Sequence, residues 1–288
     1  MKERLAFFGP GRAGLSFGYA LWQTGQVASL TYFGRRSEPP SHPLFTQGLA
    51  EYVFGVDRPA EGTTALVLSV PDDALSEMAQ AVAARGMAPQ GCSAFHLSGS
   101  LSTEALAPLH ARGYAVGSLH PLVTIAHPVT GADRLTEAVF AISGEAEAVA
   151  RGRALVHLIG ASPIQIPVRA RPSYHAAAVM ASNYVAVVFL AAARILTRTG
   201  LTEQESLSAL LPLAKGTLED LEGVGGLRAL VGPVVRGDRE TIALHLRSLE
   251  GPDRELYGEL GRELVRVCID EGLDQDRADE ILEVLRTT

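Results

Sequence analysis

The sequence has few cysteines and no excess of positive charge. Its two cysteines, Cys92 and Cys268, are far apart among 288 residues and lack the spacing of metal ligands, so neither a disulfide framework nor a metal site is expected. The formal net charge is -7 at pH 7, and no basic segment points to nucleic acid or anionic lipid. These absences favour a protein of the reducing cytoplasm without a nucleic-acid partner.

The sequence also lacks the long apolar runs of secreted and membrane proteins. Only a short apolar run follows the first four residues, so no signal peptide is predicted. Residues 176–193 carry no formal charge and approach the length of about 20 residues that spans a bilayer, but Ser182, Asn183 and Tyr184 lie in their middle. We interpret this stretch as the buried central helix of a second domain and expect no membrane partner.

The first half of the chain alternates between apolar strands and helical stretches. The composition, 47% hydrophobic and 20% charged, is that of a folded protein, and this length usually holds two domains. Such alternation is typical of a doubly wound, Rossmann-type α/β sheet in which most strands are parallel. The predicted strands are residues 5–8, 29–33, 65–70, 94–97, 115–118, 139–142 and 163–166, with helices that include residues 15–23, 73–84 and 145–158.

The second half changes to a helical pattern. Residues 165–173 carry Pro167 and Pro172 together with Arg169 and Arg171, and the β-branched alternation disappears after them. We therefore place a boundary between an α/β domain of Rossmann type, residues 1–167, and an all-helical domain, residues 168–288. The predicted helices are residues 174–199, 202–211, 213–221, 239–249, 253–270 and 276–285.

A glycine-rich turn joins the first strand to the first helix. In this context glycines let the backbone approach a pyrophosphate, and the helix N-terminus donates N–H groups to it. The turn therefore predicts dinucleotide binding. The alternative is a purely structural turn, because glycine is frequent in this chain,. The residues of the turn are Gly9, Pro10, Gly11, Arg12, Ala13 and Gly14.

The end of the second strand indicates which dinucleotide is bound. An NAD site usually places Asp or Glu there to bind the ribose 2′-hydroxyl, whereas this sequence reads Gly34-Arg35-Arg36-Ser37. Two guanidiniums and a hydroxyl suit a 2′-phosphate, so we expect NADP as the cofactor. The alternative is a solvated turn whose charges bind no ligand.

Residues that follow the later strands are candidates for the chemistry, because ligands of doubly wound sheets bind at the carboxyl ends of the strands. Ser98 and His120 can orient a polar group and move a proton. For His120 the alternative is a structural histidine that holds the turn by hydrogen bonds. Asp72 and Asp73 are expected to cap the following helix. The residues expected to contact the cofactor here are Ser69, Val70 and Pro71.

The start of the helical domain offers two further candidates. Ser173 is predicted as an N-cap, which places His175 in the first helical turn. Val179 and Asn183 follow His175 at positions i+4 and i+8 on one face. His175 and Asn183 are therefore expected to bind the substrate. The alternative is that both are polar side chains whose hydrogen bonds are made inside a helix bundle.

A later loop, residues 232–238, precedes another helix. Asp238 is predicted to cap that helix. Arg236 has two alternative partners, an anionic substrate or a carboxylate of the protein, and we favour the carboxylate.

These motifs together resemble a known family. The whole chain resembles the bacterial Rossmann-like proteins that carry the domain of unknown function 2520. Its N-terminal part is similar to the cofactor domain of pyrroline-5-carboxylate reductases and of the 3-hydroxyacid and 6-phosphogluconate dehydrogenases. The resemblance implies a Rossmann domain, a helical dimerisation domain similar to that of 6-phosphogluconate dehydrogenases, and an oxidoreductase. The segments that carry it are FGPGRAG at 8–14, VPD at 70–72, HLSG at 96–99, LHPL at 119–122, YHAAAVMASN at 174–183 and GPVVRGD at 232–238.

One departure from the hydroxyacid dehydrogenases bears on the mechanism. Those enzymes use a lysine, with an asparagine four residues later, on the first helix of the second domain, whereas the lysines of this chain are Lys2 and Lys215. The His-Pro pair after a late strand is similar to that of prephenate dehydrogenases, in which the histidine meets the substrate hydroxyl. This similarity gives His120 weight over His175. It implies a reduction assisted by histidines rather than a lysine-dependent alcohol oxidation.

Two hypotheses for the function follow. The first is an NADP(H)-dependent oxidoreductase that acts on a small polar, anionic substrate at the interdomain cleft, where Ser98, His120, His175 and Asn183 bind the substrate and handle its proton. The second is an NADP-binding sensor or partner protein without turnover. Because residues 176–193 are apolar around most of the helix circumference, we also expect a homodimer through the helical domain.

Overall fold

The computed structural model describes residues 2–225 and 230–286. The chain divides into two compact units, Met1–Ser182 and Asn183–Thr288. This division falls later than the predicted boundary after residue 167. The reason is that the helix α7, Arg171–Val179, begins with a buried side chain, Arg171, which is hydrogen-bonded to the sheet of the first unit. The first helix beyond the predicted boundary is therefore anchored on the first unit.

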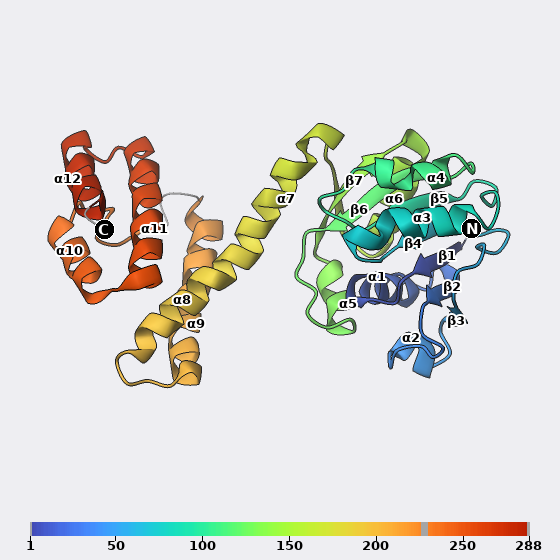
Figure 1. The fold of residues 1–288 in the computed structure, drawn as a ribbon, viewed down its shortest axis with the longest axis horizontal. Coiled ribbons are helices and arrows are strands. Elements are labelled where there is room, and N and C mark those ends of the chain that lie inside the picture. The colour runs from blue at the N-terminus through green and yellow to red at the C-terminus, as the bar shows by residue number, and fades with distance from the viewer. Residues whose placement is uncertain (1, 226–229, 287–288) are drawn as a thin grey trace. The chain divides into compact units, whose positions relative to one another are not determined.

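The first unit is built on one sheet. Within the described residues, its strand order is β3-β2-β1-β4-β5-β6-β7-β8 (Figure 1). Neighbouring strands are parallel except β7, which is antiparallel to β6. This topology confirms the predicted doubly wound α/β sheet and its extension by two late strands. The strands are β1 Glu3–Phe8, β2 Val27–Gly34, β3 Glu51–Phe54, β4 Ala65–Leu68, β5 Ser93–His96, β6 Ala115–Pro121, β7 Val139–Gly144 and β8 Ser162–Gln165.

Strand β3 is absent from the strands predicted from the sequence. It lies at the edge of the sheet beside β2, and none of its four residues is buried. Tyr52 and Val53 pack against the two core clusters, but four residues are too few to show the two-residue period of a strand in the sequence.

Helices cover both faces of the sheet. Alternate residues of β1 face opposite ways: Leu5 and Phe7 pack in one core cluster, and Ala6 and Phe8 pack in the other, as the two-residue period of a strand requires. The first cluster lies under α1 (Arg12–Gln23), α5 (Thr130–Leu135) and α6 (Ala146–Leu158). The second lies under α3 (Leu75–Ala83) and α4 (Ala107–His110), which share the other face (Figure 1). The short helix α2 spans Pro43–Thr46.

The helix that leaves the first unit differs from the prediction at its start. A 3-10 turn, Val168–Ala170, precedes α7, and Ala170 rather than Ser173 is the N-cap residue. Pro172 occupies the first turn, where a missing N–H costs nothing. His175 consequently lies in the second turn, beyond the first turn in which it was expected.

The same helix is interrupted where the sequence predicts a continuous face. Met180–Tyr184 form a π-helical segment between α7 and α8, Val185–Thr197. A π-helical turn holds more residues than an α-helical turn, so it rotates the residues that follow. The π-helical segment changes the angular spacing on which the predicted alignment of Asn183 with His175 and Val179 was based, and that alignment stays a prediction.

The second unit is helical, as predicted. Helix α9, Glu203–Asp220, runs through Pro212, so the predicted break between residues 211 and 213 is wrong. Helices α10 (Arg239–Ser248), α11 (Gly251–Asp270) and α12 (Gln275–Arg286) pack around a small core that includes Ile242 and Val265. A second π-helical segment, Leu221–Gly225, follows α9.

The apolar helix predicted to be buried is mostly exposed. The buried residues of α8 are Ala191 and Ala193, whereas Val187 and Leu190 are 53% and 51% exposed. The expectation that this stretch is the buried central helix of the second domain is wrong for α8, because the other helices of its unit leave most of it uncovered. Among the described residues, one helix, Val168–Thr197, is long and apolar enough by composition to cross a membrane.

Candidate functional site

The glycine turn has the geometry of a phosphate-binding loop. Gly9 has a φ of 98°, a conformation that favours glycine, and a Cβ on it would lie 2.7 Å from the carbonyl oxygen of Ser69. A Cβ on Gly14 would collide with the Ser69 hydroxyl, which donates to the Gly9 carbonyl at 2.6 Å. These glycines let α1 begin directly against the end of β4.

The N-terminus of α1 is suited to an anion. Gly11 is its N-cap residue, no side chain caps the helix, and its first turn holds no acidic residue. Backbone N–H groups at such an end attract phosphate because of their partial positive charge. Arg12, Ala13 and Gly14 form this first turn. The residues present therefore fit the pyrophosphate of a dinucleotide.

A cavity of about 480 Å³ opens beside the glycine turn. It brings together most of the residues predicted to bind the cofactor; Arg12, Ala13, Gly14 and Ser37 are not among its lining. Glu38 and Tyr52 also line it and were not predicted from the sequence, because neither belongs to a glycine motif or follows a predicted strand directly. The predicted residues that line it are Gly9, Pro10, Gly11, Arg35, Arg36, Ser69, Val70 and Pro71.

The loop after β2 presents its charges to the cavity. Arg35, Arg36 and Ser37 are exposed, and within the described chain no ion pair involves either arginine. The Tyr52 hydroxyl donates to the Arg36 carbonyl at 2.7 Å and holds the loop in place. Two guanidiniums without ion-pair partners, on a loop fixed by a hydrogen bond, are suited to a phosphate. The same exposed side chains would also be found in a solvated turn that binds no ligand.

Beyond the cavity, a carboxylate and two hydroxyls meet at the ends of β4 and β5. Ser98 Oγ and Ser100 Oγ both donate to Asp72 Oδ2, at 2.8 and 2.7 Å. The prediction that Asp72 and Asp73 cap the helix after Pro71 is wrong, because neither the 3-10 turn there nor α3 has a side-chain cap. The serine hydroxyls, which are distant in sequence, compete for the Asp72 carboxylate more effectively than the helix does.

His96, the last residue of β5, fixes the loop that carries Ser98 and Ser100. It is fully buried, and its Nδ1 accepts the backbone N–H of Ser98 at 3.2 Å. Burial, with Arg171 nearby, lowers the pKa of His96 to about 4. A neutral His96 therefore fixes the backbone at Ser98 near neutral pH.

Arg171 connects the loop after β5 to the strands β6 and β7. Its side chain is 1% exposed. Nη1 donates to Ser118 Oγ on β6 at 2.7 Å and to Ser143 Oγ on β7 at 2.8 Å, and Nη2 donates to the Ser98 carbonyl at 2.6 Å. Burial lowers the pKa of Arg171. The sequence did not reveal this role, because an arginine beside prolines has the pattern of a linker.

His120 lies next to the first residues of α7. Its Nδ1 is 2.6 Å from the hydroxyl of Tyr174, and the two rings are perpendicular. Burial, then His175 and Arg171, lower the pKa of His120 to about 4. Burial also raises the pKa of Tyr174 to about 12. Both side chains are therefore neutral at pH 7.

Gly99 brings His120 and His175 together. A Cβ on Gly99 would lie 2.5 Å from Nδ1 of His175 and 2.7 Å from Nε2 of His120, so both nitrogens converge on the position that glycine leaves vacant. The two imidazole rings are 5.8 Å apart between centroids. Nδ1 of His175 is buried and has no hydrogen-bond partner among the described residues,.

The structure thus unites three of the four predicted catalytic residues. Ser98 precedes Gly99 in the chain, and His120 and His175 surround Gly99 at the carboxyl ends of β5 and β6. Asn183 belongs to the second unit and is exposed, so its role stays a prediction.

The loop before α10 contains Asp238 and Arg236, for which the sequence predicts a helix cap and a charged partner. Asp238 caps α10, as predicted, by accepting the Thr241 N–H at 3.1 Å. Arg236 is exposed and makes no ion pair with any carboxylate in the described part of the chain. Hydrogen bonds from Thr241, and then the charge of Arg236, lower the pKa of Asp238, so Arg236 interacts with a carboxylate of the protein through space without a direct ion pair.

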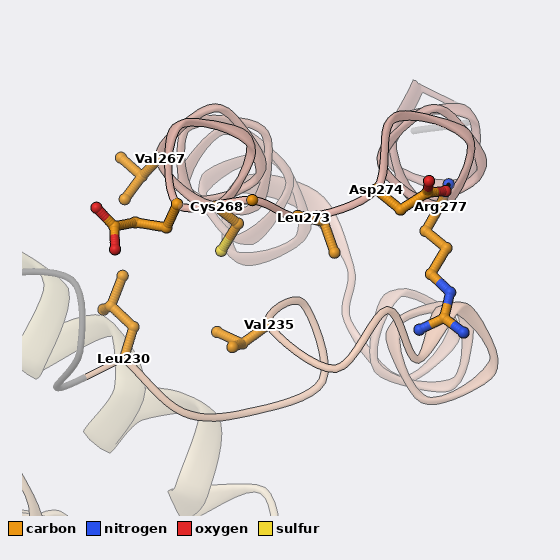
Figure 2. Close-up of a pocket in the computed structure, with 9 residues that line it drawn as sticks. Leu230, Val235, Val267, Cys268, Leu273, Asp274 and Arg277 are labelled. Atoms are coloured by element: carbon orange, nitrogen blue, oxygen red, sulfur yellow. Dashed lines mark hydrogen bonds between the residues drawn. The ribbon is translucent and has the colours of Figure 1, made fainter.

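A second cavity, of about 380 Å³, lies in the second unit. Figure 2 shows Cys268 of α11 facing Val235 across it, with Asp274 and Arg277 on another side. Burial raises the pKa of the Cys268 thiol, which makes the thiol a poor nucleophile. None of the predicted catalytic or cofactor residues lines this cavity.

Two family models match successive parts of the chain. Residues 5–121 match a Rossmann-like domain, and residues 138–264 match the domain of unknown function 2520. The chain is a Rossmann-like protein with a DUF2520 domain. The first match ends with β6, and the second begins just before β7, which is antiparallel to β6. Arg171 donates to Ser118 on β6 and to Ser143 on β7, so it connects the two matched parts.

Solved structures share the whole fold. A protein from Thermotoga maritima is 23% identical with a TM-score of 0.71, and the match covers 93% of this chain and 99% of that one. A Plasmodium falciparum pyrroline carboxylate reductase with NADP bound is 12% identical, with a TM-score of 0.58 and 98% coverage of both chains. A Myxococcus stipitatus imine reductase in complex with NADP+ is 18% identical, with a TM-score of 0.57 and coverage of 99% of this chain and 93% of that one. At these identities the likeness establishes the fold. No curated protein sequence matches the chain.

Proposed function

We propose that this DUF2520 protein is an NADP(H)-dependent oxidoreductase that reduces a small polar substrate. The observation that carries the proposal is the combination, in one unit, of a cavity at the glycine turn with a cluster of histidines at the carboxyl ends of neighbouring strands,. The pyrroline carboxylate reductase and imine reductase that share the fold carry NADP, which supports the choice of cofactor.

The cofactor residues have distinct tasks. The backbone N–H groups at the start of α1 hold the pyrophosphate, Arg35 and Arg36 hold the 2′-phosphate, and Ser69, Val70 and Pro71 line the remaining wall. When bound, the reduced dinucleotide supplies a hydride. Ser37 is the remaining hydroxyl near the phosphate, on the same exposed loop.

The substrate is bound by the cluster around Gly99. His120 and His175 present nitrogens to one point, and Ser98 holds the loop through Asp72. Because His120 is neutral at pH 7, it serves as a hydrogen-bond donor rather than as a fixed cation. We expect an anionic substrate with a C=N or C=O bond; the name of the Plasmodium reductase, which includes a carboxylate, supports that choice.

The test is NADPH oxidation against a panel of cyclic imines, 2-ketoacids and other carbonyl compounds, with and without a carboxylate. We expect turnover with one class, and His120→Ala should lower kcat by about 100-fold while the NADPH affinity stays within a few-fold. Tight NADPH binding without turnover on the whole panel would favour the second hypothesis, an NADP-binding sensor.

We also propose that the protein is a homodimer through its helical unit and that it acts in the cytoplasm. Helices α8 and α9 expose a run of large apolar side chains, and contact of so much apolar surface with water is unfavourable. A second copy of the same surface would cover them with matching apolar groups. The exposed side chains are Val185, Val187, Val188 and Leu190 on α8 and Leu211, Leu213 and Leu218 on α9.

A further inference from the structure

Two histidine–tyrosine pairs in this chain have the same geometry. In the first unit, His120 Nδ1 lies 2.6 Å from the Tyr174 hydroxyl, with ring centroids 5.6 Å apart and an interplanar angle of 90°. In the second unit, His245 Nδ1 lies 2.7 Å from the Tyr257 hydroxyl, with centroids 5.7 Å apart and an angle of 89°. The second pair therefore serves as an internal reference for the first.

The surroundings of the two pairs differ. His245 is exposed on α10 in the second unit. His120 is partly buried, faces His175, and has the buried guanidinium of Arg171 close to it and to Tyr174. The His120–Tyr174 pair therefore lies in the candidate site, whereas the His245–Tyr257 pair, with the same local geometry, lies at the surface of the second unit.

The hydrogen bond between Tyr174 and His120 has a preferred direction. A phenol O–H is a stronger donor than a neutral imidazole N–H, and an imidazole nitrogen is a stronger acceptor than a phenol oxygen. Burial raises the pKa of Tyr174, so the hydroxyl keeps its proton at pH 7 and has it to donate. Tyr174 therefore donates and Nδ1 of His120 accepts.

This direction decides the tautomer of His120. When Nδ1 accepts a hydrogen bond, the ring proton of a neutral imidazole resides on Nε2. Nε2 is the atom that faces the vacant Cβ position of Gly99, next to the unpartnered Nδ1 of His175. The N–H of His120 is therefore directed at the point where the two histidines converge.

We propose that Tyr174 is a positioning residue that fixes His120 as its Nε2–H tautomer, and that the reacting group of the substrate is an unprotonated carbonyl or imine whose lone pair accepts this N–H. An iminium N–H would meet the N–H of His120 instead of a lone pair, so a protonated imine is disfavoured at this atom. The choice of substrate class rests on the proposed oxidoreductase function, whereas the tautomer does not.

The proton step balances within these residues. As the substrate carbon gains a hydride from the reduced dinucleotide, its oxygen or nitrogen takes the proton from Nε2 of His120. Nδ1 of His120 takes the proton of the Tyr174 hydroxyl, so the imidazole stays neutral. The resulting phenolate lies near the Arg171 guanidinium and takes its proton back from Nδ1, while Nε2 regains a proton from water, so His120 returns to its Nε2–H tautomer.

The tautomer can be measured without any substrate. Long-range ¹H–¹⁵N spectra of the ¹⁵N-histidine-labelled full-length protein at pH 7 distinguish Nε2–H from Nδ1–H rings, and the signal of His120 is identified by its loss in His120→Asn. We expect a single Nε2–H tautomer in the wild type, a mixture in Tyr174→Phe, and no change at His120 in the matched control Tyr257→Phe. An Nδ1–H ring in the wild type, or an unchanged tautomer in Tyr174→Phe, would overturn the proposal.

Steady-state kinetics of the same variants distinguish a failure of this proposal from a failure of the proposed function. With whichever substrate the NADPH assay identifies, Tyr174→Phe should lower kcat by about tenfold or more and change KM and NADPH affinity by no more than a few-fold, while Tyr257→Phe should match the wild type. A normal kcat in Tyr174→Phe would overturn the positioning role. Absence of turnover in the wild type would overturn the oxidoreductase function and leave the tautomer assignment standing.

Discussion

Arg171 donates from Nη2 to the carbonyl oxygen of Ser98 at 2.6 Å, across 73 positions of sequence. The same guanidinium holds Ser118 and Ser143. One buried side chain therefore sets the position of α7, of the loop after β5, and of two neighbouring strands. In our proposal Ser98, His120 and His175 bind the substrate, and all three lie on elements that Arg171 joins.

Replacement of Arg171 should destabilise the protein. Arg171→Ala removes three charge-assisted hydrogen bonds and opens a cavity at a site that is 1% exposed, so we expect the free energy of unfolding to fall by about 2–4 kcal/mol. The exposed Arg169, two residues earlier, provides the matched control, and Arg169→Ala should change stability by less than about 0.5 kcal/mol. Urea denaturation measures both. Equal effects of the two substitutions would contradict the anchoring role.

Gly99 should tolerate no side chain if the histidines are to function. Its φ is not among the positive values that disfavour other residues, so alanine fits the backbone and only the collision with His120 and His175 remains. Gly99→Ala should lower turnover by about tenfold or more and leave NADPH affinity unchanged.

The control for this substitution is Gly216→Ala on α9, where a Cβ would meet nothing within 4 Å. It should leave turnover unchanged and raise helix stability by up to about 1 kcal/mol. Full activity in Gly99→Ala would show that the two histidines do not need their observed positions.

Dinucleotide preference can be tested by fluorescence. Trp22, the single tryptophan, lies on α1 eight residues beyond Gly14, about 12 Å along the helix at 1.5 Å per residue, so a bound reduced nicotinamide should quench it. We expect NADPH to bind roughly ten- to a hundredfold more tightly than NADH, because charge-assisted hydrogen bonds contribute about 1.5–3 kcal/mol each.

Substitution of both Arg35 and Arg36 by Ala should reduce NADPH affinity to nearly that of NADH and leave NADH binding unchanged. Arg112→Ala, at another exposed arginine of the first unit, should alter neither. Equal binding of both dinucleotides by the wild type would show that the loop after β2 is the solvated turn of the alternative interpretation.

Acidification should destabilise the first unit. The folded-state pKa values of His96 and His120 are lowered to about 4 from 6.5, so the unfolded chain binds more protons than the folded one between these values. The stability that these neutral histidines confer is present above pH 6.5 and is lost as the pH falls toward 4. Tm measured from about pH 7 down to about pH 4.5 at constant ionic strength should decrease.

A pair of histidine variants tests whether the decrease of Tm with falling pH comes from the buried histidines. His96→Gln should flatten the dependence of Tm on pH, whereas His157→Gln, at an exposed histidine of α6, should leave the slope as it is in the wild type. A Tm that stays constant over this pH range would contradict the lowered pKa values.

The dimer should depend on the exposed face of α8. Val187→Glu combined with Leu190→Glu places two charges at side chains that are 53% and 51% exposed, so we expect light scattering to show a monomer where the wild type is a dimer at micromolar concentration. Leu244→Glu, at an exposed leucine of α10, should remain a dimer. A wild-type monomer would remove the interface, and a wild type that needs detergent to stay in solution would favour a membrane as the covering surface.

The local features of this protein were determined by the sequence alone. The strand, glycine turn and helix at residues 5–23 follow from periodicity and from glycines whose conformations depend on near neighbours,. The same holds for Asp238 as a helix cap, because the Thr241 N–H it accepts is three residues away. The mostly parallel sheet follows from the alternation of strands and helices.

The site itself was decided by the tertiary structure. Asp72 binds Ser98 and Ser100 instead of capping its helix, and Tyr174 reaches His120 across 54 positions. Local pattern cannot show which distant partner a polar group will find, since that depends on how strands and helices pack. For the same reason the sequence identified His120 as a candidate, whereas only the fold determines the hydrogen bond that sets the direction of its proton.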